Sequence, residues 1–275
     1  MSGAQAATIG KDLISRINRL RVMHSSNWGA TLDQIEWKAR GLERADRSGY
    51  LAVLSMVAAL KGDQAVLLAS ADEIEQRFPH HETDRLNALR SLCIARRSVE
   101  AKAYAIRFVD EQFQGDYVST DVVSTAGWCM ATLGEAQLGA AIARKFFQSR
   151  RSAEEEISFE ILTLHHLAEL GDALEKDGVS DLELGALIDA TLKALAEQGW
   201  AHPGIQVTPS IARDATGPSA VLAMYIDTDE DCQRALEVEE AVMTTLCGNR
   251  LFSELQVVVS INAIETASIS QAECA

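Results

Sequence analysis

Apolar residues recur three and four positions apart over most of the first 200 residues, which is the spacing that places side chains on one face of a helix. The clearest segment runs from Leu51 to Pro79, where Gly62-Asp63 forms a turn between two such stretches. Looser copies place their turns at Arg97-Ser98 and Gly134-Glu135, so the unit recurs at about 36 residues. A fixed period of this length is typical of stacked two-helix repeats.

The same spacing predicts helices on both sides of these units. An amphipathic helix is expected over residues 6–23, and the pair Thr31 and Gln34 matches a capping box that opens a second helix, which ends at the turn Arg47–Gly49. Two more capping boxes, Ser152 with Glu155 and Ser180 with Glu183, predict a final helix pair that closes the array.

The pattern changes after Trp200. Apolar residues alternate over 205–211, form a short run over 221–226 and alternate again over 255–261, while residues 229–246 keep the spacing of a helix. Thr216-Gly217-Pro218 predicts the turn between the first two strands. We therefore expect a mainly α protein: an antiparallel helix-pair solenoid over residues 1–200, followed by a small α+β unit of order β-β-α-β over residues 201–275.

Segment Leu51–Pro79 resembles a tetratricopeptide repeat, with large apolar and small residues on two helices, a Gly-Asp turn and a closing proline. The third unit adds Gly127 at the position where the two helices of such a repeat cross closely. The resemblance implies a groove that binds a protein or peptide, and the role of an adaptor or chaperone that needs neither catalysis nor a cofactor. Its expected binding residues lie on the inner helices and include Asn87, Arg90 and Thr125.

Charge is distributed unevenly along the chain. Residues 1–150 carry 19 Lys+Arg and 17 Asp+Glu, whereas residues 151–275 carry 6 and 23, and the whole chain has a formal net charge of −15. The acidic half favours a basic partner and makes nucleic acid an unlikely one. The first half holds 14 arginines and 5 lysines. Because arginine binds carboxylates through two parallel hydrogen bonds, a carboxylate-bearing partner is the other expectation, with pairing to the acidic second half, or plain solvation, as the alternative.

Expectations about localisation and about membrane binding rest on segments that the sequence does not contain. No apolar run approaches the roughly 20 residues that a membrane-spanning helix needs, so no membrane partner is expected. The N-terminal residues do not have the pattern of a secretory signal, and the five cysteines are scattered, which is typical of a reducing compartment. We therefore expect a cytoplasmic protein, with Cys93 and Cys129 on the apolar faces of repeat helices.

Two alternative functions remain open at this stage. His165, His166 and Glu169 share one predicted helix and could form an enzyme site at the junction of the helical and α+β parts. No second pair of metal ligands and no catalytic motif accompanies them, so neither a metal nor a catalytic residue is predicted. In the other alternative, the strand Leu255–Ala263 pairs with a second copy of the chain, giving a homodimer through the C-terminal part.

Overall fold

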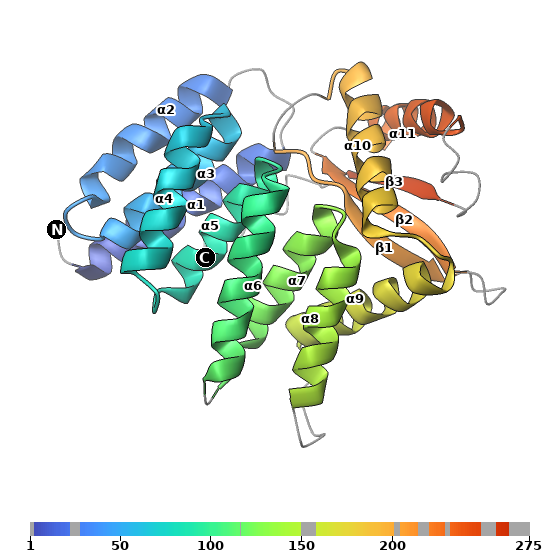
Figure 1. Ribbon diagram of the computed structural model, residues 1–275. Helices are drawn as coiled ribbons and strands as arrows, with labels where there is room; N and C mark the ends of the chain where they lie inside the picture. The colour runs from blue at the N-terminus through green and yellow to red at the C-terminus, as the bar shows by residue number, and fades with distance from the viewer. Residues whose placement is uncertain are drawn as a thin grey trace.

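The computed structural model describes residues 3–22, 28–115, 117–149, 158–200, 204–213, 220–228, 232–248 and 257–263. These residues form a mainly helical protein with a small three-stranded sheet near the C-terminus (Figure 1). Among the described residues, ten α-helices precede the sheet. They are α1 (Gly3–Val22), α2 (Trp28–Ala39), α3 (Arg47–Lys61), α4 (Gln64–Arg77), α5 (Glu82–Ile94), α6 (Ser98–Gln114), α7 (Thr120–Thr132), α8 (Ala136–Ser149), α9 (Phe159–Lys176) and α10 (Asp181–Glu197), with a short 3-10 helix at Arg40–Leu42.

The helices pack on their neighbours in the chain and, in part, on every second helix. Consecutive helices joined by short turns lie against each other, as in α3 with α4 and α7 with α8. The odd-numbered helices also pack on one another in order, so that α1, α3, α5, α7 and α9 form one continuous row. The row buries the apolar faces that a single pair would leave exposed, with α3 and α5 almost fully buried along their length.

The turns between the helices have the chemistry that the sequence predicts. Gly62 has a φ of +74° and ends α3, and the Asp63 carboxylate then accepts a hydrogen bond from the Val66 N–H at the start of α4. Gly134, with a φ of +88°, occupies the corresponding turn between α7 and α8. The predicted turns at Gly62-Asp63, Arg97-Ser98 and Gly134-Glu135 are therefore confirmed by the helix boundaries.

Helices α7 and α8 approach most closely at two glycines. A Cβ atom built on Gly139 would lie 2.7 Å from the carbonyl oxygen of Gly127, and one built on Gly127 would lie 2.7 Å from Leu167 Cδ1 of α9. A side chain at Gly139 would require α7 and α8 to move apart, whereas one at Gly127 would require Leu167 to change its position. The expected role of Gly127 at a tight helix crossing is thus confirmed.

Several predicted helix boundaries are wrong. Helix α2 begins at Trp28, so Thr31 lies inside it, and Arg47–Gly49 is the first turn of α3 because Asp46 caps that helix through Gly49. The Ser152–Glu155 box lies outside the described residues, whereas the capping box of Ser180 and Glu183 is confirmed.

The prediction that α9 and α10 form a closing helix pair is also wrong. Helix α9 packs on α7 and α8 and so extends the row, while α10 packs on the later helix α11 (Cys232–Leu246) and, to a lesser extent, on α8. Helices α9 and α10 do not lie along each other, and Figure 1 shows α10 crossing in front of the strands. Helix α11, which packs on β3 as well as on α10, takes the place of the partner expected for α10.

The sheet has the predicted order of elements. Strand β1 (Thr208–Arg213) pairs antiparallel with β2 (Ala220–Thr228), and β2 pairs in parallel with β3 (Val258–Ala263) after the crossover through α11. Leu222, Met224 and Ile226 lie on one face of β2 and are buried, whereas the other face carries Tyr225 beside Thr208 and Ser210 of β1. The predicted turn Thr216-Gly217-Pro218 lies outside the described residues.

The outer edge of β3 is covered by side chains of α11. The Val259 N–H donates to Met243 Sδ over 3.3 Å, and the Ile261 N–H donates to Glu239 Oε2 over 2.9 Å. Since these backbone groups already have partners within the chain, the edge presents few free donors for another strand.

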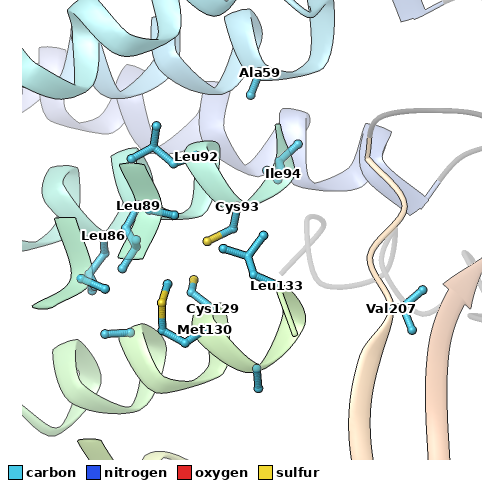
Figure 2. Close-up of a cluster of buried hydrophobic side chains, with 14 of the residues drawn as sticks. Ala59, Leu86, Leu89, Leu92, Cys93, Ile94, Cys129, Met130, Leu133 and Val207 are labelled. Atoms are coloured by element: carbon cyan, nitrogen blue, oxygen red, sulfur yellow. The ribbon is translucent and has the colours of Figure 1, made fainter. Parts of the chain in front are cut away.

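One hydrophobic cluster extends from Ala6 in α1 to Ile261 in β3 and so joins both parts of the molecule. Figure 2 shows its section between α5 and α7, where Cys93 and Cys129 point toward each other among leucine side chains. Both thiols are fully buried, which raises the pKa of Cys93 well above its ordinary value. Their expected position in the core is therefore confirmed. No described helix has the length and apolar character needed to cross a membrane.

Candidate functional site

A cavity of about 1010 Å³ lies between the row of inner helices and the polar face of the sheet. Its helical wall comes from α1, α5, α7 and α9, and its opposite wall comes from β1, β2 and the segment just before β1. The polar and charged lining residues are Asn18, Arg21, Arg90, Asp121, Ser124, Thr125, Glu160, Thr163, His165, His166, Glu169, Gln206, Thr208, Ser210 and Tyr225. The cavity is open to solvent and has the size of a ligand pocket, roughly 300–1,000 Å³ in proteins.

The segment before β1 closes this space against the first helix. The Arg21 guanidinium of α1 donates a hydrogen bond to the Gln206 side-chain oxygen, 185 residues later in the chain. Beside it, a Cβ atom on Gly204 would lie 2.7 Å from the Trp28 ring and 3.0 Å from the Arg21 Cα. The C-terminal part therefore spans the inner face of the helical row, so one wall of the expected groove belongs to the chain's own sheet.

The structure brings together the three binding residues predicted from the sequence. Arg90 of α5 donates a hydrogen bond of 3.2 Å to the Thr125 hydroxyl of α7 and a long one of 3.5 Å to Asn87 Oδ1. Thr125 in turn donates to Asp121 Oδ1 over 3.3 Å. Arg90 and Thr125 line the cavity, whereas Asn87 is 3% exposed and lies behind them. Asn87 thus orients Arg90 and does not itself face the open space.

Most other arginines of the first half are engaged in ion pairs within the protein. The pairs are Arg40 with Glu36, Arg47 with Glu73, Arg77 with Glu73, Arg85 with Glu111, Arg96 with Asp189, Arg97 with Glu100, Arg107 with Glu75, and Arg144 with Asp172 and Glu175. Of these arginines only Arg96 and Arg144 pair with acids of the second half, so most of the pairs lie within the first half. Arg90 differs, because its hydrogen bonds go to neutral oxygens and no described carboxylate forms an ion pair with it.

His166 is the residue that connects the helical wall to the sheet. Its Nε2 lies 2.7 Å from the Ser210 Oγ of β1, so α9 and β1 are joined by a hydrogen bond across the cavity wall. Burial lowers the pKa of His166 below its ordinary value, although the nearby Glu169 carboxylate acts in the opposite direction. The lowered pKa favours the neutral imidazole over the imidazolium at neutral pH.

The neighbouring residues on α9 have different surroundings. The His165 ring stacks on Phe147 of α8, with ring centroids 4.3 Å apart. Phe159 and Leu162, one turn apart at the start of α9, line the cavity and remain 80% and 55% exposed. Large apolar side chains exposed beside a cavity are typical of a surface that binds another molecule.

No metal centre is found among the described residues, since no group of three His, Cys, Asp or Glu side chains is placed to hold an ion. His165, His166 and Glu169, the residues of the alternative enzyme site, nevertheless line the same cavity as Arg90 and Thr125. The two hypotheses drawn from the sequence therefore refer to one location in the structure.

Sequence reasoning did not identify Arg21, Gln206, Ser210 or Tyr225 as site residues. The alternation over 205–211 places Thr208 and Ser210 on the polar side of a strand. This was the one sequence pattern that could have indicated Ser210 as a site residue. It does not indicate which helix this side faces, because the pairing of β1 with α9 joins residues 44 positions apart.

Comparisons with known proteins do not place the chain in a family. No family model matches the chain, no curated protein resembles it, and no solved structure matches it.

Proposed function

We propose that the protein is a binding scaffold that takes the carboxylate-bearing end of a partner protein or peptide into the cavity between the helical row and the sheet. The supporting observation is Arg90, a half-buried cation on the cavity wall that has no ion-pair partner in the described chain. Arginine binds a carboxylate through parallel hydrogen bonds, and Asn87 and Thr125 hold its side chain in place for that contact.

The other lining residues suit a peptide. Phe159 and Leu162 offer an apolar contact at one rim, while the exposed carboxylates of Asp121 and Glu169 favour basic side chains. A peptide with a free carboxylate, an apolar residue and a basic residue could contact Arg90, the apolar rim and the two carboxylates at the same time. The row of paired helices would act as a repeat scaffold of the tetratricopeptide-like kind, which suits an adaptor or chaperone.

Self-association through β3 is less well supported than binding in the cavity. The hydrogen bonds from Val259 and Ile261 to side chains of α11 would have to break before a second strand could pair at those positions.

The proposal predicts that binding depends on Arg90. We would measure fluorescence polarisation with a library of labelled ten-residue peptides, each made with a free and with an amidated C-terminus. We expect peptides with a free carboxylate to bind the unmodified protein, and Arg90→Gln to weaken their binding about tenfold or more, since a hydrogen bond to a charged group contributes roughly 1.5–3 kcal/mol.

Arg40→Gln is the matched control, because Arg40 is an exposed arginine of the first half that pairs with Glu36 away from the cavity. It should bind like the unmodified protein. Equal binding of free and amidated peptides, or unchanged binding by Arg90→Gln, would contradict the proposal.

A further inference from the structure

Ser210 and His166 have the arrangement of a nucleophile and its general base. The Ser210 Oγ lies 2.7 Å from His166 Nε2, within the distance that proton transfer requires. Both side chains line the open cavity of about 1010 Å³, so a substrate can reach the hydroxyl.

The surroundings of the pair favour proton transfer from Ser210 to His166. When Nδ1 of His166 carries the proton, Nε2 accepts the hydrogen bond from the Ser210 hydroxyl, and the neutral ring that burial favours is the form able to take the proton. Glu169, one helical turn away, attracts the imidazolium that forms. The other ionisable groups lining the cavity are Arg21 and Arg90 from α1 and α5, Asp121 from α7, His165 and Glu160 from α9, and Tyr225 from β2.

We propose that Ser210 and His166 are the catalytic residues of an esterase activity in this cavity. The Ser210 Oγ attacks the carbonyl carbon of a carboxylic ester while its proton moves to His166 Nε2. The bond from the carbonyl carbon to the alcohol oxygen then breaks, and the alcohol leaves with the proton from His166. Water attacks the acyl-serine in the second half, His166 again accepts and returns the proton, and the free carboxylic acid is released.

This activity goes beyond the binding proposed above and does not depend on it. Arg90 binds through its own hydrogen bonds on α5, and loss of peptide binding in Arg90→Gln would leave the chemistry of Ser210 in place. Conversely, an inert Ser210 would leave the peptide-binding experiment valid, so the two proposals fail separately.

The decisive experiment treats the folded, full-length protein with a fluorophosphonate probe, which forms a covalent bond with activated serines. We expect mass spectrometry to locate the adduct on Ser210, and the rate of labelling to rise with pH to a midpoint below about 6.5, the ordinary pKa of histidine, as His166 becomes neutral. Ser210→Ala should give no adduct at that peptide, and His166→Gln should slow labelling about a hundredfold.

Ser260→Ala is the matched control, since Ser260 lies on the same face of the sheet, on β3, and does not line the cavity. It should be labelled at the rate of the unmodified protein. The rate of p-nitrophenyl acetate hydrolysis should likewise be the same in the unmodified protein and Ser260→Ala, lower in His166→Gln and lost in Ser210→Ala. An unmodified protein that keeps its helical circular dichroism and forms no adduct on Ser210 would overturn the proposal. In that case the hydrogen bond to His166 only joins β1 to α9, and Ser210→Ala would lower the melting temperature and nothing else.

Discussion

At the scale of single residues, His166 shows how burial links a side chain to the stability of the fold. Its pKa in the folded protein lies below the ordinary histidine value of 6.5, and desolvation is the main cause. Below pH 6.5 the unfolded chain therefore binds a proton at this residue before the folded protein does. Folding stability falls as the pH drops through this range, and the loss ends once the pH is below the folded pKa.

We accordingly expect the melting temperature to decrease between pH 7.5 and pH 5, and His166→Gln to reduce the decrease by removing this group. Carboxylates whose pKa is lowered by ion pairs, such as Glu36 and Glu73, titrate below about pH 4.5 and stay outside this window. Differential scanning calorimetry at several pH values would measure the effect. His80→Gln, in an exposed turn, is the control, and parallel curves for His166→Gln and the unmodified protein would argue against the assignment.

Arg85 illustrates what a sequence cannot reveal about one residue. It is one of the first-half arginines for which we expected a groove, pairing with the acidic half or solvation, yet it is 2% exposed. Its guanidinium lies over the Phe108 ring at 3.9 Å and pairs with Glu111 at 2.6 Å. The contacts come from α6, one helix further along, and no local pattern around Arg85 signals them.

At the scale of elements, the turn between α7 and α8 shows how a tertiary contact changes the role of a glycine. Gly62 and Gly134 both have a positive φ in equivalent turns. A Cβ atom on Gly62 meets nothing within 4 Å, whereas one on Gly134 would lie 2.4 Å from the Cα of Gly185 in α10. The first position requires glycine only for its backbone conformation, and the second also for the close packing of α10.

We therefore predict that Gly62→Ala lowers the free energy of unfolding by about 1–2 kcal/mol, the cost of a left-handed conformation for alanine. Gly134→Ala should cost clearly more, because α10 has to move away from the turn. Urea denaturation followed by circular dichroism would give both values. Equal losses for the two variants would mean that the contact with Gly185 does not contribute.

At the scale of the whole molecule, the break in charge near residue 151 does not coincide with a break in packing. Helix α9 belongs to the acidic half of the sequence but packs on α7 and α8. Arg144 pairs with Asp172, and Arg96 with Asp189, so ion pairs join the two halves. The strands add to this continuity, since β1 packs on α9 and α7 and α11 packs on α10.

The division of the chain at residue 200 is accordingly best tested by truncation. A protein of residues 1–200 would expose the surfaces of α7, α9 and α10 that the C-terminal part covers. We expect it to melt at a lower temperature than the full chain and to bind the dye 8-anilinonaphthalene-1-sulfonate, because buried apolar area is the main source of stability. A truncated protein with an unchanged melting temperature and no dye binding would show instead that the helical part folds independently.

The sequence alone determined the class of the protein, most of its helices, the turns at Gly62, Arg97 and Gly134, and the β-β-α-β order at the C-terminus. These features arise from local chemistry: helical spacing, capping side chains and glycines at turns, which act between residues close in the chain. It also identified Arg90, Thr125 and His166 as candidates, but on separate grounds and for different functions.

Only the tertiary structure decided that these residues share one cavity, that α10 packs on α11 and not along α9, and that Ser210 faces His166. Each of these results depends on contacts between distant segments, as in the hydrogen bonds from Arg21 to Gln206 and from His166 to Ser210. The face of a helix or strand can be predicted from its own residues. The element that this face meets depends on the packing of the whole chain, which local patterns do not record.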